Sequence, residues 1–283
     1  MQPGIGSWTY GWAAGVKGYP KPATPLTPLH LLERANAFGV EVVQIADNMP
    51  LKLLSGAELD ELSRVASAAN ITLEIGTVGV QPRNLLQHLE IADRLGARLI
   101  RSLIADVGSR PEVAQATRWI AEALPQYEAA GVCLALENYE QYTARELGDL
   151  IRGIGSPALG VCLDTVNSLG ALETPDMLIA ELGPWVRSLH VKDFAIERAP
   201  SRMGFQVVGR PAGQGMLNVP RLVSQLQAAN VAPNLILELW TPDQGSVEAS
   251  IRLEEEWAAE SVRFLKRFCP AGCVAGAESI ADA

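Results

Sequence analysis

Four side chains of metal-ligand type each close a short apolar run in the second half of the chain. They are Glu137 after Leu134-Ala135-Leu136, Asp164 after Val161-Cys162-Leu163, His190 after Ser188-Leu189, and Glu238 after Leu235-Ile236-Leu237. Three carboxylates and one imidazole suit a hard or borderline divalent cation better than a thiolate-loving one. The pattern predicts one divalent metal ion held by these four residues. Mn²⁺ is the first expectation, and Mg²⁺, Co²⁺ and Zn²⁺ are the alternatives.

Each of these residues taken alone has an ordinary structural explanation. A single acid at the end of a strand usually contacts solvent or caps a helix, and a single histidine in an apolar strand usually belongs to the core. The other two histidines, His30 and His88, fall in segments of helical pattern, which leaves His190 at a strand end. Burying three carboxylates together is costly without a cation, because like charges repel and each charge loses its hydration. The joint pattern therefore favours a metal site.

The elements that must position these residues form a regular series. Short apolar, β-branched runs alternate with segments of helical period, which is typical of repeated βα units. Eight such units close a (β/α)8 TIM barrel, an α/β fold in which the carboxyl ends of all strands meet at one face. The eight predicted strands are Gly4–Trp8, Val42–Ala46, Thr72–Ile75, Leu99–Ile104, Val132–Glu137, Gly160–Leu163, Ser188–Lys192 and Leu235–Leu239.

Glycines at expected helix ends and the lengths of the connecting segments agree with this series. Gly39, Gly96 and Gly131 precede predicted strands at positions typical of helix C-caps. Two segments, Tyr10–Pro25 and Phe194–Gly215, are longer than tight βα turns, and we expect the second to be a loop that closes over a substrate. The barrel is predicted to span residues 1–270 as one domain, followed by a tail of small residues over 271–283.

Composition excludes several classes of function. The net charge of −9 disfavours a nucleic-acid partner, which needs a basic surface. No apolar run is long enough to span a membrane and no secretory signal opens the chain, so the sequence predicts a cytoplasmic protein without a membrane partner. Self-association into a homo-oligomer stays open. Cys133 and Cys162 are interpreted as buried thiols, and Cys269 and Cys273 receive no function.

Several segments together resemble the sugar phosphate isomerase/epimerase superfamily of xylose isomerase-like barrels, over almost the whole chain. The resemblance implies that Glu137, Asp164, His190 and Glu238 hold one metal ion and that the substrate is a small keto sugar or sugar acid. The segments that carry it are Ala135-Leu136-Glu137-Asn138, Cys162-Leu163-Asp164-Thr165, Leu189-His190-Val191-Lys192-Asp193, Gly213-Gln214-Gly215, Asn218-Val219-Pro220 and Leu237-Glu238-Leu239.

One position departs from the pattern of that superfamily. The ketose 3-epimerases carry a substrate-binding histidine three residues after the aspartate ligand, and this chain has Asn167 there. Asn167 is therefore a candidate substrate-binding residue, while epimerisation of a free ketose is put in doubt. The segments Gly6-Ser7-Trp8-Thr9-Tyr10 and Gly209–Gly215 resemble a branch that includes 3-oxo-isoapionate decarboxylase.

The remaining candidates surround the predicted metal site. Glu137 and Glu238 are candidate acid and base groups. Lys192, two residues after His190, is predicted by strand alternation to point to the same side and to bind an anionic substrate group or polarise a carbonyl; a solvated lysine is the alternative. Arg210 is a candidate cation for binding the substrate, with a surface residue as the alternative. Trp8, Tyr10 and Trp240 are candidate pocket walls, with core packing as the alternative.

Three functions remain open at this point. The first is a metal-dependent isomerase or epimerase of a keto sugar or sugar acid, working through an enediolate. The second is a metal-dependent decarboxylase of a 3-oxo sugar acid such as 3-oxo-isoapionate, a lyase that forms the same intermediate. The third is a barrel that binds a sugar without turnover, which four intact ligand residues disfavour.

Overall fold

Eight parallel strands close into a barrel, as the sequence predicts. The computed structural model describes residues 1–106 and 108–268, so the predicted tail and Cys269 and Cys273 lie outside the described residues. Around the barrel the strands follow the order β1-β10-β7-β6-β5-β4-β3-β2. Their bounds are β1 Pro3–Gly6, β2 Val42–Ile45, β3 Thr72–Val78, β4 Leu99–Leu103, β5 Cys133–Glu137, β6 Leu159–Asp164, β7 Val186–Val191 and β10 Asn234–Leu237.

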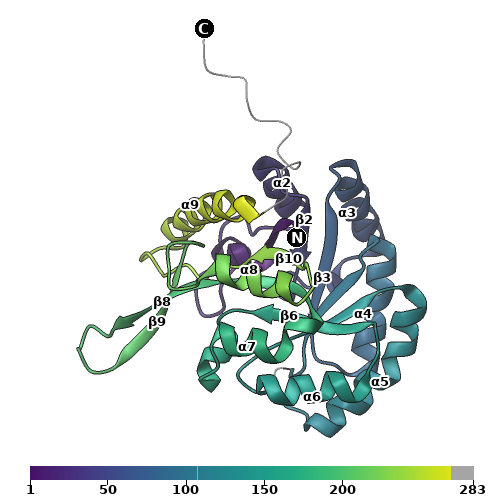
Figure 1. Ribbon diagram of the computed structural model, residues 1–283. Coiled ribbons are helices and arrows are strands. Elements are labelled where there is room, and N and C mark those ends of the chain that lie inside the picture. Colours follow the sequence, from purple (N-terminus) through teal and green to yellow (C-terminus); the bar gives the residue numbers. More distant parts are fainter. Residues whose placement is uncertain (107, 269–283) are drawn as a thin grey trace.

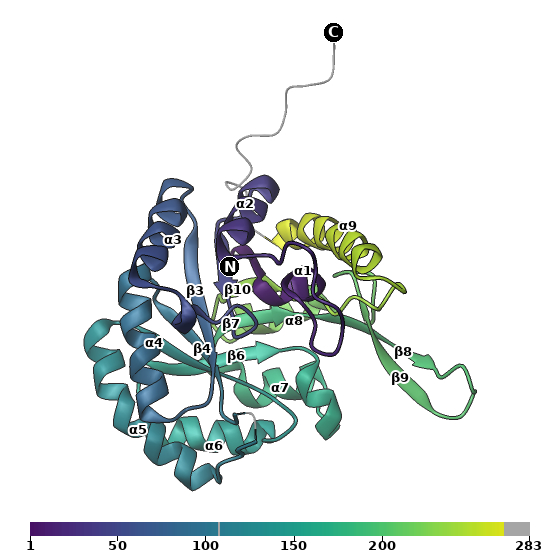
Figure 2. The same cartoon turned by 180° about the vertical axis from the view of Figure 1, so that it is seen from behind.

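Helices cover the outside of the barrel (Figures 1 and 2). The predicted caps Gly39, Gly96 and Gly131 follow three of them in the left-handed conformation, with φ of 57°, 70° and 63°. Within the described residues, no helix has the length and apolar character needed to cross a membrane. The bounds are α1 Gly11–Ala14, α2 Pro28–Phe38, α3 Gly56–Ala68, α4 Pro82–Leu95, α5 Val113–Ala130, α6 Ala144–Ile154, α7 Pro175–Leu182, α8 Val219–Ala228 and α9 Val247–Leu265.

The first strand is shorter than predicted. It ends at Gly6, and Ser7–Tyr10 forms a 3-10 turn instead of continuing the strand. The hydroxyl group of Thr9 explains the change, because its oxygen accepts the backbone N–H of Gly6 at 3.1 Å and its proton is donated to the carbonyl of Leu237. These bonds hold the 3-10 turn in place directly after the strand.

The long segment Phe194–Gly215, predicted as a loop, is largely regular. Strands β8 (Asp193–Arg198) and β9 (Phe205–Arg210) pair antiparallel. They project from the barrel as a two-stranded ribbon (Figure 1). Neither strand alternates apolar and polar residues, so the sequence did not distinguish a ribbon from an irregular loop.

The base of this ribbon is fixed by the buried carboxylate of Asp193. It accepts the backbone N–H groups of Gly213 at 2.8 Å, Gly215 at 2.9 Å and Leu217 at 3.0 Å. A Cβ atom on Gly215 would lie 2.1 Å from Oδ1 of Asp193, so only glycine fits there. The Gly213-Gln214-Gly215 motif therefore has a structural role, because it closes the loop onto Asp193.

A second buried acid, Glu254 of α9, holds the short helix α1. Its two carboxylate oxygens accept the backbone N–H groups of Trp12 at 2.9 Å and Ala13 at 3.0 Å. Burial raises the pKa of Glu254 to about 8, although these two hydrogen bonds act in the opposite direction. The folded protein therefore binds a proton at Glu254 more tightly than the unfolded chain does.

We expect this acid to give the folded protein a falling pH dependence of stability. Because the folded pKa is raised, its contribution is complete below about pH 4.5 and is lost as the pH rises through about 8. The slope is at most about 1.4 kcal/mol per pH unit. Urea unfolding of metal-free protein from pH 5 to pH 8 should show this decline, and the decline should be shallower in a Glu254→Gln variant. Equal slopes in the two proteins would contradict the assignment.

Candidate metal centre

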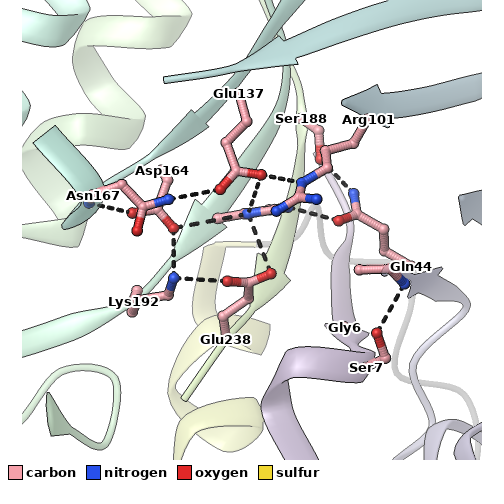
Figure 3. A network of polar contacts seen from close by, with 12 residues as sticks. Gly6, Ser7, Gln44, Arg101, Glu137, Asp164, Asn167, Ser188, Lys192 and Glu238 are labelled. Atoms are coloured by element: carbon pink, nitrogen blue, oxygen red, sulfur yellow. Dashed lines mark hydrogen bonds and ion pairs between the residues drawn. The ribbon is translucent and has the colours of Figure 1, made fainter. Parts of the chain in front are cut away.

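The four predicted ligands converge at the carboxyl end of the barrel strands. Glu137 and Asp164 are the last residues of β5 and β6, His190 lies in β7, and Glu238 directly follows β10. Nδ1 of His190 lies 3.7 Å from Oε2 of Glu137, 3.8 Å from Oδ2 of Asp164 and 3.3 Å from Oε1 of Glu238. All four side chains are buried. Figure 3 shows the carboxylates of Glu137, Asp164 and Glu238 gathered in one cluster.

The donor set fits a divalent cation. Asp164, His190 and Glu238 each offer one ligand atom, and these atoms lie within 4.8 Å of one another. Among the described residues, neither Nδ1 of His190 nor Oε1 of Glu238 has a hydrogen-bond partner. A buried polar atom without a partner costs about 1–3 kcal/mol, and a cation between these atoms would remove that cost. The residues present are therefore suited to hold one divalent ion.

Two cations already neutralise part of the cluster. Nζ of Lys192 lies 2.9 Å from Oδ2 of Asp164 and 2.9 Å from Oε2 of Glu238, which confirms that Lys192 points to the side of His190. The guanidinium of Arg101 contacts Glu137 through Nε and lies 2.8 Å from Oδ1 of Asp47 through Nη1. Burial opposes the charge of both cations, yet the surrounding carboxylates raise the pKa of Lys192 and that of Arg101.

The two glutamates of the cluster differ in their electrostatic surroundings. Burial raises the pKa of Glu137, and Arg101 and His190 only partly oppose that effect. Burial also acts to raise the pKa of Glu238, but His190, Lys192 and Arg101 together lower it to about 2. Glu137 is consequently the glutamate that carries a proton more readily.

Asn167, predicted as a substrate-binding residue, lies beside the cluster, and its side chain contacts Glu137. Its Nδ2 group donates to Oε1 of Glu137 at 2.7 Å. Its backbone N–H, together with that of Val166, donates to Oδ1 of Asp164 at 2.7 Å. Asn138 adds a second clamp, because its side chain accepts the backbone N–H of Asp164 at 2.7 Å and donates to the carbonyl of the same residue. These bonds fix the directions of both carboxylates.

A cavity of about 220 Å³ adjoins the metal centre on the side of Glu137. Its wall combines carboxylates and phenol rings with apolar side chains. Oε1 of Gln141 is buried there and has no hydrogen-bond partner among the described residues. The cavity is large enough for a small hydroxylated molecule. Its lining includes Asp47, Leu103, Glu137, Tyr139, Gln141 and Tyr142.

The other predicted substrate contacts are more dispersed. Arg210 ends β9, where its guanidinium pairs with Glu197 of the ribbon and donates to the carbonyl of Gly209. Tyr10 is fully buried, with the guanidinium of Arg34 4.9 Å from its ring centre, which favours the core-packing alternative. Trp8 and Trp240 are half-buried.

Sequence reasoning missed four polar residues of the site. Gln44, Glu74 and Arg101 each interrupt an otherwise apolar strand run, as in Val42-Val43-Gln44-Ile45, and Asp47 closely follows the second strand. All but Asp47 are buried in the barrel. A lone polar residue inside a short strand is the signal that could have found them, because a barrel strand turns every second residue inward.

Comparison with known proteins agrees with this geometry. The model of the xylose isomerase-like TIM barrel family matches residues 32–268. The chain belongs to this family.

Two curated relatives and one solved structure are similar to the chain. It is 34% identical over 265 residues to 3-oxo-isoapionate decarboxylase of Pectobacterium atrosepticum, covering 94% of this chain and 95% of that one. It is also 34% identical over 206 residues to 2-epi-5-epi-valiolone 7-phosphate 2-epimerase of an Actinoplanes species, covering 69% and 70%. The crystal structure of D-psicose 3-epimerase in the presence of D-fructose superposes with a TM-score of 0.72 at 16% identity, covering 95% and 99%.

Proposed function

We propose that this protein is a divalent-metal-dependent decarboxylase of a 3-oxo sugar acid. The observation that carries the proposal is Lys192, a cation held 2.9 Å from two ligand carboxylates at the edge of the metal centre. A substrate carboxylate needs such a fixed cation beside the reacting carbonyl. The likeness over nearly the full chain to 3-oxo-isoapionate decarboxylase supports the same reaction.

The charges of the cluster are compatible with an anionic substrate. Glu137, Asp164, Glu238 and Asp47 against Arg101 and Lys192 leave two net negative charges, which a divalent ion would neutralise. A substrate carboxylate would then meet Lys192 without net repulsion, and the ion would stabilise negative charge on a reacting oxygen. When bound there, the ion supplies Lewis-acid chemistry that polarises a carbonyl group.

The side chains of the site bind the substrate and transfer the proton. Lys192 orients the substrate carboxylate, and the cavity beside Glu137 takes the hydroxylated end of the substrate. When the carbon–carbon bond breaks, CO₂ leaves and its bonding electron pair stays on the substrate as an enediolate. One proton must then reach the carbon, and Glu137, which lines the cavity, can take it up from solvent and pass it on. Arg101 and Asn167 hold its two oxygens in place.

A second candidate is an isomerase or epimerase of a keto sugar or sugar acid. The likeness to a 2-epimerase over two thirds of the chain favours it, and so does the presence of two glutamates on separate strands. That reaction removes and returns a proton, so it needs one group as base and another as acid. We infer Mn²⁺ as the working metal in either case, because oxygen ligands dominate the site.

Incubation with Mn²⁺ in D₂O separates the two reactions. The purified protein is given a panel of 3-oxo sugar acids and neutral keto sugars, and CO₂ release and deuterium incorporation are measured. The proposal expects CO₂ from a 3-oxo acid with one deuterium in the product. Deuterium exchange into a substrate without CO₂ would select the isomerase instead.

We expect Lys192→Met to raise KM for the acidic substrate about 10- to 100-fold, because one charged hydrogen bond is lost while the stem volume is kept. KM for a neutral keto sugar should rise much less. Steady-state kinetics measure both, and the Mn²⁺ content of the variant, expected to stay at one ion per chain, shows that the centre is intact. If the variant turns over every acidic candidate at an unchanged rate, the substrate is a neutral ketose and not a sugar acid.

A further inference from the structure

A chain of buried polar side chains runs from the imidazole of His190 down into the barrel. Nε2 of His190, the nitrogen that faces away from the three carboxylates, lies 2.7 Å from Oε1 of Gln44. Nε2 of Gln44 lies 2.9 Å from Oε2 of Glu74. All three residues are at most 3% exposed. Gln44 and Glu74 are register partners on β2 and β3, so both side chains enter the same level of the barrel.

Glu74 is surrounded by hydrogen-bond donors. Besides the amide of Gln44, the hydroxyl of Ser188 donates to Oε2 at 3.1 Å and the amide of Asn234 donates to Oε1 at 2.8 Å. Ser188 and Asn234 are themselves register partners on β7 and β10. A carboxylate only accepts hydrogen bonds, so it fixes which end of each neighbouring amide faces it.

The carboxylate of Glu74 acts on the metal centre by fixing the orientation of the Gln44 amide. Its NH₂ group must face Glu74, so its oxygen must face His190. An oxygen can only accept, and Nε2 of His190 must therefore carry a proton. In a neutral imidazole this leaves Nδ1 unprotonated, with its lone pair on the side of Glu137, Asp164 and Glu238.

Among the described residues, the His190 ring has no second hydrogen-bond partner that favours this tautomer. The three carboxylates on the Nδ1 side favour a protonated Nδ1, because they attract its proton and repel its lone pair. The hydrogen bond to Gln44 opposes that preference from the other side of the ring. The orientation of Gln44 in turn depends on the charge of Glu74, which lies beyond it.

We propose that Glu74 is a positioning residue that holds His190 in its metal-binding tautomer through the side-chain amide of Gln44. Glu74 touches neither the metal nor the substrate in this account. The inference rests on the proposed metal centre. It extends the centre from its four ligands to a carboxylate on a strand that supplies none of them.

The test compares Glu74→Gln with the wild type by two measurements. A glutamine at this position can donate as well as accept, so the amide of Gln44 is free to turn its NH₂ group toward His190. We expect the dissociation constant for Mn²⁺, measured by calorimetry, to rise about 10- to 100-fold, the usual effect of losing an outer hydrogen-bond partner of a ligand.

The second measurement observes the imidazole itself. In metal-free protein, ¹⁵N-edited NMR should show His190 with its proton on Nε2 and with Nδ1 unprotonated, and in Glu74→Gln the proton should shift toward Nδ1. The chain has three histidines, so substitution of His30 and His88 identifies the signal. A Glu254→Gln variant also loses a buried carboxylate, but in α9, and should change neither measurement.

The possible outcomes separate the inference from the proposed function. If the wild type binds no Mn²⁺, the metal centre itself is wrong. If the wild type binds Mn²⁺ and Glu74→Gln keeps both the affinity and the Nε2 proton, the inference is overturned. Should Glu74→Gln fail to fold, Gln44→Met removes the acceptor directly, and the same two changes are expected from it.

Discussion

Replacing Glu238 with alanine is expected to raise the dissociation constant for Mn²⁺ by more than about 100-fold and to lower kcat by about 10³-fold. The variant removes one of three ligand atoms that lie within 4.8 Å of one another. It also leaves Lys192 with Asp164 as its single carboxylate partner among the described ion pairs of that lysine. Both losses act on the same centre, so metal content and turnover should fall together.

Glu256→Ala is the matched control for this variant. Glu256 is an exposed glutamate of α9, and its loss should leave Mn²⁺ affinity and kcat unchanged. Metal analysis after dialysis and steady-state kinetics provide the two readouts. Full metal content and activity in Glu238→Ala would show that this residue is not a ligand.

Arg101→Met is expected to lower the free energy of unfolding of the metal-free protein by about 3–5 kcal/mol, because it strands a buried charge. The side chain of Arg101 is only 4% exposed, and its removal leaves Glu137, with 1% exposure, without its guanidinium partner. Added Mn²⁺ should restore part of the loss, since a divalent ion supplies positive charge near the same carboxylate.

Arg94→Met separates this effect from the general cost of losing an arginine ion pair. Arg94 and Asp60 are paired at the surface, with 45% and 62% of their side chains exposed, so we expect a loss of less than about 1 kcal/mol. Urea unfolding with and without Mn²⁺ measures both variants. Equal losses of unfolding free energy in the two variants would mean that the buried pair stabilises the fold no more than the surface pair does.

The barrel and the convergence of the four candidate ligands could be predicted because they depend on local pattern and on one rule of topology. Apolar runs such as Leu134-Ala135-Leu136 mark the strands, and parallel closure brings their carboxyl ends to one face. Asp164 and His190 are direct register partners in the structure, which is the contact that this rule anticipates.

The supporting residues could not be predicted because their contacts cross the barrel. Gln44 and His190 are 146 positions apart, and Ser188 and Glu74 are 114 apart. Strand spacing says which residues face inward but not which of them meet. The same limit applies to Tyr10, whose burial under Arg34 depends on how α2 packs, and to the ribbon, whose pairing needs two strands from one long segment.

The most direct test of the metal-dependent account is a titration of activity against bound metal. The wild-type protein is stripped with a chelator and then given Mn²⁺ in steps, while turnover of a 3-oxo sugar acid and metal content are measured on the same samples. We predict no turnover without metal and a linear rise that saturates at one ion per chain. Full turnover by the stripped protein, or turnover that does not follow occupancy, would contradict the account.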